Sequence, residues 1–570
     1  MHSRLALRTA GWVAGLTAAL WMTAGPSAVA GTSAAAGGSA AAGTSAPPSA
    51  HSSPSAISSP NASSSPGAGS WTVYHGDPAG SGTAAPVHRV DTASRAWTSV
   101  ALDGKIYGEP LVSAGRVYVA TENNTVYALS AASGKVAWSR HLATPVPSAS
   151  LPCGDIAPTV GITGTPVIDP GRSEIFVVAD EVAGGRPAHV LTGLSTPTGR
   201  VEMTREVDPP GVDTAALLQR TGLTLAGGRV VFGFGGNDGD CATYRGRVVA
   251  VPEAGGPPAM FTVDAKTGQS QGAVWMGGAA PAVDARGDVW VSVGNGSVYQ
   301  ASRGYDDSDS VLDLSPSMRL LQYFAPADWA SENSRDLDMS AEPALLPGGQ
   351  VLLAGKSRIA YLLNGTHLGG IGGQLATLGP VCGSDIDGGP AVTGSTVYLP
   401  CAGAGIAAVR AATSPPGLRL LWRSSTGGGP PIVAGGLVWT ISLSGTLYGL
   451  DPQTGQVRQQ AALGAVANHF PTPSVGAGLL LASSANRVVA FRATGAAGAP
   501  GSPASTVPAS TVPASTGPAK QSSPPGQAGG PTAAGGGLSG GAIAGIAAGG
   551  VVLLGGAGWL VWRRSRPRAS

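Results

Sequence analysis

The sequence has little of what marks several large classes of protein. Only 12% of its 570 residues are charged, and 34 Lys and Arg side chains nearly balance 32 Asp and Glu, leaving a net charge of +2. Basic residues form no block outside the extreme C-terminus, so nothing predicts a nucleic-acid-binding surface. A glycine-rich phosphate loop and a nucleophilic serine elbow are both missing, and the eight histidines lack metal-ligand spacing. The sequence therefore gives no signal for phosphate binding, for that type of hydrolase, or for a metal held by imidazoles.

Cysteine is also scarce, with four residues: Cys153, Cys241, Cys382 and Cys401. No CxxCH motif occurs, so covalent c-type haem is not expected, and no CxxC pair suggests zinc. An even number of cysteines in a segment that we expect to be exported favours disulfides. Cys382–Cys401 is the pair expected first, because the two lie close in sequence around one strand hairpin, and Cys153–Cys241 then remains.

What the sequence does have is a short apolar segment, rich in Val, Tyr, Trp and Phe, that recurs eight times after a similar turn. The copies begin at Gly115, Ser173, Gly228, Gly287, Gly349, Ser395, Gly436 and Gly478, at intervals of 41 to 62 residues. Strand repeats of this length are typical of β-propellers, in which each sheet is stable only when it packs between neighbours. We therefore predict an all-β fold, an eight-bladed β-propeller with four-stranded antiparallel blades.

Each repeat has further regular parts. A second strand follows the marker segment, and several copies then run into a turn that contains Gly134, Gly199 or Gly455. An earlier short strand usually follows a proline, which suits the first residue of a strand. The eighth repeat runs out after Arg492, so we expect the segment 94–102, SRAWTSVAL, to supply its outer strand and close the ring.

The N-terminal 30 residues have the pattern of a secretory signal peptide. Arg4 and Arg8 precede the apolar stretch 10–22, and Ala28-Val29-Ala30 is a small-residue cleavage site. Residues 31–70 are rich in Ala, Ser, Pro and Gly, which predicts a disordered linker. The folded propeller is then expected over residues 71–492.

The C-terminal region predicts a membrane anchor. Residues 493–537 form a Pro/Ala/Ser/Thr-rich stalk, and residues 538–562 are apolar and uncharged over a length that spans a bilayer. The arginines of the tail 563–570 predict that this end stays in the cytoplasm and that the propeller is extracellular. A buried core helix is the alternative for 538–562. A tandem GxxxG at Gly541, Gly545 and Gly549 allows helix-mediated dimerisation, although Gly/Ala-rich composition explains the pattern as well. The Gly- and Ala-rich bias suggests a bacterial protein.

The order of elements (apolar strand, VYAL-like strand, Thr-Gly turn, then Trp) resembles the repeat of propellers related to pyrroloquinoline quinone (PQQ) dehydrogenases, over about residues 97–492. The stretch 272–296 resembles a segment of the quinoprotein alcohol dehydrogenases. That resemblance implies that Trp275 is the floor beneath the quinone and that Asn295 is a calcium ligand. It further implies that Asp336 or Asp338 is the catalytic carboxylate and that Lys356 contacts the quinone oxygens.

The same comparison shows departures from the family pattern. No Glu stands where the family's glutamate calcium ligand should fall; Asp238 or Asp240 is the substitute, and we take Asp240 as the candidate. The adjacent-cysteine disulfide and the haem domain are missing. Each candidate residue also has a structural explanation: Trp275 as a packing aromatic, Asn295 as a turn residue, and the aspartates as a solvated strand start. Lys356, if it points inward, requires a partner, because burial of an unpaired ammonium group is costly.

Three functions remain after this comparison. The first is a binding or scaffold propeller, held at the cell surface, whose partner is a protein or surface ligand. The second is an alcohol dehydrogenase that uses PQQ and calcium and passes electrons to a membrane acceptor. The third is a structural spacer for surface display. We favour the first, because the predicted metal shell is incomplete.

Overall fold

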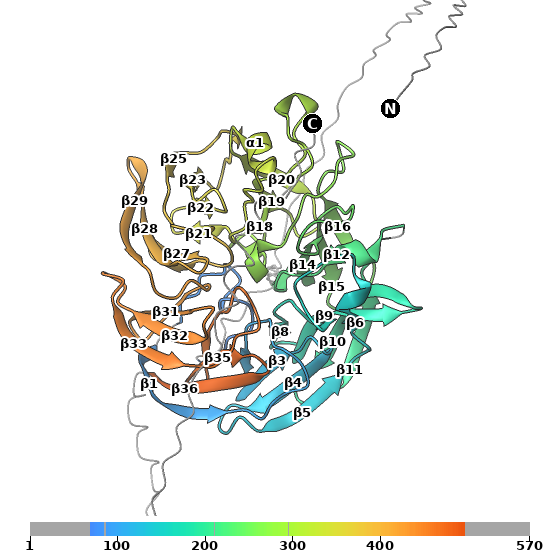
Figure 1. Ribbon diagram of the computed structural model, residues 1–570, viewed down its shortest axis with the longest axis vertical. Helices are drawn as coiled ribbons and strands as arrows, with labels where there is room; N and C mark the ends of the chain where they lie inside the picture. The colour runs from blue at the N-terminus through green and yellow to red at the C-terminus, as the bar shows by residue number, and fades with distance from the viewer. Residues whose placement is uncertain (1–68, 85–86, 210, 295, 496–570) are drawn as a thin grey trace, which may run out of the picture. The chain divides into compact units, whose positions relative to one another are not determined.

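The computed structural model describes residues 69–84, 87–209, 211–294 and 296–495. Over these residues the chain forms eight mainly antiparallel sheets that follow one another around a central axis (Figure 1), together with one separate two-stranded pair, β6 (Val146–Pro147) with β7 (Thr159–Val160). This arrangement confirms the predicted eight-bladed β-propeller. The signal peptide, the candidate span 538–562, the tail, and both predicted linkers except residues 69–70 and 493–495 lie outside the described residues and stay predictions. Residues 493–495, predicted as the start of the stalk, belong to the last strand of the propeller.

The first four blades contain these strands. Blade 1 has β2 (Leu111–Ser113), β3 (Arg116–Ala120), β4 (Thr125–Ser130) and β5 (Val136–His141). Blade 2 has β8 (Val167–Asp169), β9 (Glu174–Ala183), β10 (Arg186–Ser195) and β11 (Val201–Glu206). Blade 3 has β12 (Leu217–Leu218), β13 (Thr224–Ala226), β14 (Arg229–Gly236), β15 (Arg247–Pro252) and β16 (Ala259–Thr262). Blade 4 has β17 (Ala282–Val283), β18 (Val289–Val293), β19 (Ser310–Leu314), β20 (Leu320–Ala325) and β24 (Gly370–Ile371).

The other four blades complete the ring. Blade 5 has β21 (Ala344–Leu346), β22 (Gln350–Ala354), β23 (Ala360–Asn364) and β25 (Ala376–Leu378). Blade 6 has β26 (Ala391–Thr393), β27 (Thr396–Cys401), β28 (Gly405–Thr413) and β29 (Pro416–Ser424). Blade 7 has β30 (Ile432–Ala434), β31 (Leu437–Ile441), β32 (Thr446–Leu450) and β33 (Val457–Ala462). Blade 8 has β34 (Ser474–Gly476), β35 (Leu479–Ser484), β36 (Arg487–Gly495) and β1 (Val87–Thr98).

The prediction of four strands per blade is wrong for blades 3 and 4. In blade 3, the strand β14 runs on to Gly235 and Gly236, and these two residues pair with the extra strand β12. In blade 4, β24 adds to β20 in parallel; it lies between β23 and β25 of blade 5, so blade 5 gives a short strand to its neighbour. Both additions pair backbone edges that a four-stranded blade leaves open.

Blade 8 is closed by a strand from the N-terminal side of the chain, as predicted. The strand β1 pairs antiparallel with β36, and Trp97 lies opposite Ala490. In Figure 1, β1 at the blue end of the chain lies beside β36 at the orange end. The ring is therefore held shut by main-chain hydrogen bonds between its first and last strands.

Neighbouring blades are joined by a contact between a tryptophan and a glycine turn that occurs three times. Trp97, from the outer strand of blade 8, donates its indole N–H to Ala131 O at 2.8 Å and covers Gly134 of blade 1. Trp138 and Trp422 make the same contact with the next blade, at Gly199 and Gly455. At all three turns the glycine φ is positive, and an added Cβ would collide with the indole ring. The Thr-Gly and Trp signals of the repeat thus serve inter-blade packing.

Residues 69–84, which we name the axial segment, lie inside the ring. Their main chain bonds to the first strands of blades 1, 2, 4, 6 and 7, and to Ala477 directly after the first strand of blade 8; examples are Val112 N to Trp71 O at 2.7 Å and Val392 N to Ser81 O at 2.8 Å. Because the first strand of each blade faces the axis, a segment that bonds to five of them occupies the central channel. Nothing in the sequence predicted this segment.

Several titratable side chains are buried at the centre of the ring. His75 is completely buried, stacks on Tyr74 at 4.2 Å between ring centroids, and its backbone N–H donates to Glu109 Oε2 at 2.9 Å. Burial lowers the pKa of His75 to about 3 and raises the pKa of Glu109 and Glu342 well above the usual value. His75 is therefore neutral at pH 7, and burial favours the uncharged form of both carboxyl groups.

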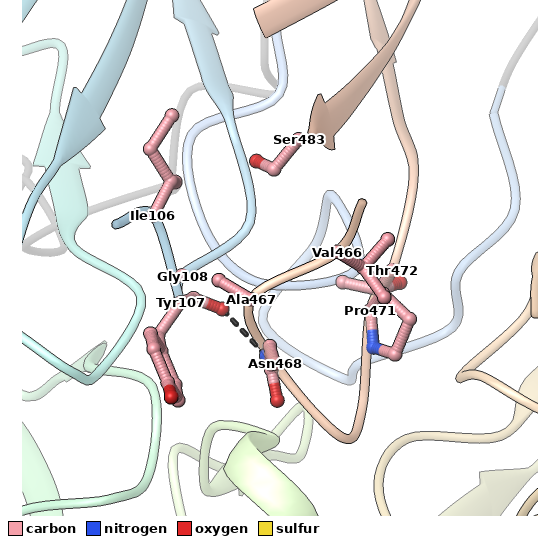
Figure 2. Close-up of a pocket in the computed structure, with 9 residues that line it drawn as sticks. All are labelled: Ile106, Tyr107, Gly108, Val466, Ala467, Asn468, Pro471, Thr472 and Ser483. Carbon is pink, nitrogen blue, oxygen red and sulfur yellow. Dashed lines mark hydrogen bonds between the residues drawn. The ribbon is translucent and has the colours of Figure 1, made fainter. Parts of the chain in front are cut away.

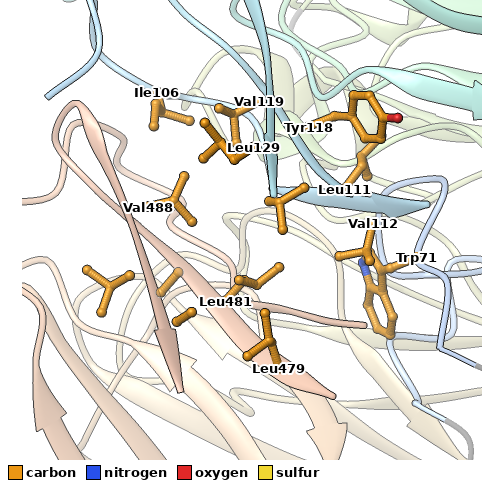
Figure 3. Close-up of a cluster of buried hydrophobic side chains, with 14 of the residues drawn as sticks. Trp71, Ile106, Leu111, Val112, Tyr118, Val119, Leu129, Leu479, Leu481 and Val488 are labelled. Carbon is orange, nitrogen blue, oxygen red and sulfur yellow. The ribbon is translucent and has the colours of Figure 1, made fainter. Parts of the chain in front are cut away.

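The largest core cluster lies at the junction of blades 8 and 1 with the axial segment. Figure 3 shows Trp71 beside Val112 and Leu479, with Leu111 and Leu481 packed above. Burial of these side chains on folding stabilises the closed ring, at roughly 25 cal/mol per Å² of apolar surface. The ring junction is thus a packed core as well as a strand pairing.

Two disulfides stabilise the loops, with the predicted pairing. Cys153–Cys241 links residues 88 apart, and Cys382–Cys401 links residues 19 apart and spans β26 and β27. No helix among the described residues is long and apolar enough to cross a membrane.

Candidate functional site

The predicted site residues come together at one end of the ring axis, which we call the mouth. Trp275 and Asp338 lie in loops that precede first strands, whereas Asp240 and Lys356 follow second strands. In an antiparallel blade the first strand begins at the end where the second strand finishes, so these loops meet. The blade topology, which follows from the repeat, therefore brings together residues that are more than 100 positions apart.

Lys356 is the centre of the charged part of the mouth. Its Nζ lies 2.7 Å from Asp338 Oδ2, 3.2 Å from Asp336 Oδ1, and 5.4 Å from the centroid of the Trp275 ring. The Asp338 side chain is 2% exposed and that of Asp336 is 53% exposed, so the lysine joins a buried carboxylate to an open one. Burial lowers the pKa of Lys356, but Asp338 and Asp336 more than offset it, and the pKa lies above its usual value. Lys356 is charged at physiological pH and has the partners that an inward-facing lysine requires.

Asp240 lies on the blade 3 side of the mouth. Tyr244 donates its hydroxyl to Asp240 Oδ1 at 2.7 Å. Burial raises the pKa of Asp240 to about 6, the tyrosine hydrogen bond lowers it, and Asp338 and Asp336 raise it again. The backbone φ of Asp240 is +48°, a left-handed conformation that aspartate tolerates better than most residues.

Asp387 of the loop before β26 was missed by the sequence analysis. It is 7% exposed, and burial raises its pKa to about 7, while Lys356 lowers it. It lies in the loop before the first strand of blade 6, as Asp338 lies in the loop before the first strand of blade 5, so comparison of these loops between repeats was the signal that could have found it.

Aromatic rings and one arginine occupy the other side of the mouth. The Phe470 ring lies 5.8 Å from the Trp275 ring, and the guanidinium carbon of Arg220 lies 5.4 Å from the Phe470 centroid and 5.9 Å from that of Tyr107. Trp275 is half-buried and also packs against the core of blades 2 and 3. It is therefore a packing residue that also faces the mouth. Sequence reasoning missed Arg220, Phe470 and Tyr107 because no local pattern marks them.

Asn468 supports this aromatic side. Its Nδ2 donates to Tyr107 O at 2.6 Å, and its Oδ1 accepts from Arg220 at 2.8 Å. Figure 2 shows Asn468 and Tyr107 below a cavity of about 10 Å³ that is also lined by Ser483 and Thr472. That volume admits about one water molecule, far below the several hundred Å³ of an organic cofactor site.

The described residues do not fit a calcium site. They contain no group of three or more His, Cys, Asp or Glu side chains placed to hold a metal ion, whereas calcium takes six to eight oxygen ligands. The predicted ligand Asn295 lies outside the described residues, so its role stays a prediction. The roles expected for Trp275, Asp336, Asp338 and Lys356 also stay predictions, although these four side chains are neighbours.

Comparison with known proteins agrees with the propeller fold. A family model of PQQ-type repeats (PQQ_2), described as outer membrane protein assembly factor BamB, matches residues 83–309, which include the first three blades and part of the fourth. Residues 83–309 therefore carry PQQ-type repeats, in a ring that is a β-propeller over the described residues. No curated protein matches this propeller.

Solved structures that are similar to the propeller include three alcohol or methanol dehydrogenases. Quinohemoprotein alcohol dehydrogenase from Comamonas testosteroni has 15% identity and a TM-score of 0.56, covering 74% of this chain and 80% of its own. The ADHIIG enzyme of Pseudomonas putida HK5, also a quinohemoprotein alcohol dehydrogenase, has 15% identity, a TM-score of 0.54 and coverages of 75% and 81%. A europium-containing methanol dehydrogenase has 14% identity, a TM-score of 0.56 and coverages of 75% and 98%. At such identities the likeness shows the fold alone.

Proposed function

We propose that this PQQ-repeat propeller is a binding or scaffold module that works at the cell surface and does not oxidise alcohols. The observation that carries the proposal is the filled axis of the ring. At the mouth, Phe470 lies against the Trp275 ring, the surface on which a quinone would stack. Along the axis, the axial segment bonds to the first strands of five blades. With the axis occupied in this way, the loops and outer faces of the described propeller are the surfaces left for partners.

Attachment to the membrane is part of this proposal. The stalk 493–537 and the apolar segment 538–562 would hold the propeller outside the cell, and the arginine-rich tail would remain inside. Added protease should then release the propeller from intact cells as a soluble fragment, detected by an antibody to it, while the tail stays with the membrane. A propeller that is digested only after cell lysis would contradict this orientation.

A second candidate function, a PQQ- and calcium-dependent alcohol dehydrogenase, is favoured by one observation. A cation, a buried carboxylate and an aromatic face meet at the mouth, where Lys356 touches Asp338 and lies over Trp275. A bound quinone would supply the hydride chemistry, with Trp275 as its stacking face and Lys356 beside its oxygens. The missing calcium group among the described residues and the contact of Phe470 with Trp275 make this the weaker candidate.

A titration of the purified full-length chain with PQQ and calcium separates the two candidates. We expect no saturable quenching of tryptophan fluorescence and no dye-linked oxidation of primary or secondary alcohols, because the Trp275 ring is already in contact with Phe470. Two variants at the mouth, Trp275→Phe and Lys356→Ala, are compared with matched variants elsewhere, Trp138→Phe and Lys266→Ala. Saturable quenching that disappears only in the mouth variants, together with turnover, would establish the dehydrogenase instead.

A further inference from the structure

A groove lies on the outer flank of the propeller, between blades 1 and 2. Its volume is about 560 Å³, within the range of sites that hold organic ligands and far above the 10 Å³ of the cavity at the mouth. One wall comes from the end of the outer strand β5 and the loop after it, and the other from β9, β10 and β11, which lie beside β5 in Figure 1. No residue named above for the mouth lines this groove.

Contacts between the two blades hold the groove at both ends. At one end, Arg140 donates from Nε to Gly199 O at 2.9 Å, just before β11 begins. At the other end, Val182 N donates to Thr144 O at 3.0 Å, so the end of β9 is fixed to the loop after β5. The two walls are therefore positioned by the fold itself, and the groove is formed before anything binds in it.

The floor of the groove is one face of the outer half of blade 2. Thr192 of β10 lies opposite Thr204 of β11, and Val190 lies opposite Glu206, so these side chains share a face. Thr192 is only 3% exposed, and its hydroxyl has no hydrogen-bond partner among the described residues. Buried hydroxyl groups normally have a partner, so this hydroxyl indicates a polar ligand group in the groove.

Two carboxylates line the same end of the groove. Glu206 is the last residue of β11, and Glu181 lies near the end of β9. Burial raises the pKa of Glu181, and the negative charge of Glu206 raises it further, so the two groups are close enough to repel each other. Within the part of the chain that the structure describes, neither carboxylate has an ion-pair partner. A cation between them would relieve this repulsion.

The two basic residues of the lining do not supply that cation. Arg140 is held at Gly199, and β11 is six residues long, so this arginine and Glu206 belong to opposite ends of a strand of about 17 Å. His141 lies with its Nδ1 3.2 Å from the Thr125 hydroxyl, on the other blade. The acidic end of the groove therefore keeps an unmatched negative charge.

The strand β11 also has an open edge next to the groove. In blade 2 it pairs with β10 alone, so the main-chain groups of its other edge have no strand partner among the residues described. An extended peptide adds to such an edge through main-chain hydrogen bonds. Alternate side chains of the added strand then point to the face that carries Thr204 and Glu206.

We propose that this groove binds an extended segment of a partner protein that carries a lysine. The segment adds to the edge of β11, and its lysine reaches over this strand into the groove. There the ammonium group lies between Glu181 and Glu206 and donates to the Thr192 hydroxyl, while Val190 contacts the aliphatic stem. Its three N–H donors match two carboxylates and one hydroxyl oxygen. This inference rests on the proposed binding function and names the surface and the chemistry of its partner.

Fluorescence polarisation of a labelled peptide, Thr-Val-Lys-Val-Thr, titrated with the full-length protein, tests this site. We expect saturable binding that weakens with added salt and falls at least tenfold when norleucine replaces the lysine. Glu206→Gln, Glu181→Gln and Thr192→Val should each weaken binding at least threefold. Glu202→Gln is the matched control, because Glu202 lies in the same strand but pairs with Arg200 and does not line the groove; it should bind like the wild type.

Thermal unfolding without peptide checks the variants. Glu206→Gln should melt at the wild-type temperature, because Glu206 has no partner to lose, and the peptide should stabilise the wild type more than this variant. Cadaverine carries the ammonium group without a peptide backbone, and a peptide with N-methylated backbone lacks the strand donors; both should bind at least tenfold more weakly.

Four results would overturn the proposal: no saturable binding of the lysine peptide, equal binding of the norleucine peptide, unchanged affinity in Glu206→Gln, or equal binding of cadaverine. The protease and quinone experiments would keep their outcomes in each case, so failure of this site is distinguishable from failure of the proposed function.

Discussion

A chain that lacks residues 69–98 will not unfold in a single cooperative transition. The deletion removes β1, the outer strand of blade 8, and with it the main-chain pairing that joins the first strand of the ring to the last. It also removes Trp97, which covers Gly134 of blade 1, and Trp71, which packs on Val112 at the ring junction. A propeller blade is stable only between its neighbours, so an open ring exposes the apolar faces of blades 8 and 1.

Denaturant unfolding, followed by tryptophan fluorescence and by circular dichroism, measures this effect. A deletion of equal length in the predicted linker, residues 31–60, is the matched control and should leave the transition unchanged. A chain that lacks only the axial segment, residues 69–84, keeps β1 and should still unfold cooperatively, although at lower denaturant concentration. An unaltered midpoint and slope for the 69–98 deletion would mean that β1 is not needed to close the ring.

Replacing Lys356 by Met will destabilise the propeller by about 3 kcal/mol, because it removes the counter-charge of a buried carboxylate. The Asp338 side chain is 2% exposed and lies 2.7 Å from the lysine Nζ. The double variant Lys356→Met, Asp338→Asn should recover most of the lost stability, since a neutral amide replaces the buried anion. The free energy of unfolding, obtained from urea titration at pH 7, is the quantity to compare.

Arg200→Met provides the control for that experiment. Arg200 pairs with Glu202 at 2.7 Å, and the two side chains are 72% and 26% exposed, so the loss should stay below about 1 kcal/mol. Additive effects in the double variant at Lys356 and Asp338, or equal losses for Lys356→Met and Arg200→Met, would show that the buried pair contributes nothing particular to stability.

The repeat was enough to predict most of the fold. Eight copies of one strand pattern implied eight blades, and the run-out after Arg492 implied a closing strand from the N-terminal side, which the structure places at Val87–Thr98. The disulfide pairing also followed from four cysteines and their spacing. The extra strands β12 and β24 were not predictable, because they depend on edges that become available only when blades are assembled.

Some residues of the candidate site were predicted from the sequence, and others were not. Resemblance to quinoprotein segments selected Trp275, Asp338 and Lys356, and the structure makes them neighbours. It gave no indication of Arg220, Phe470 or Asp387, which come from three other blades and meet the first group only around the axis. Local sequence carries no record of such contacts; Arg220 and its hydrogen-bond partner Asn468, for example, are 248 residues apart.

The sequence by itself determined the number of blades, the tryptophan–glycine joints and the cysteines that pair, because each depends on a pattern repeated within one or two neighbouring blades. Only the tertiary structure decided what fills the axis. The place of the axial segment, the Lys356–Asp338 pair and the Arg220–Asn468 hydrogen bond all result from closing eight blades into one ring, which brings together loops from distant parts of the described chain. The cost of burying an unpaired charge is the physical reason that Lys356 and Asp338 lie together there.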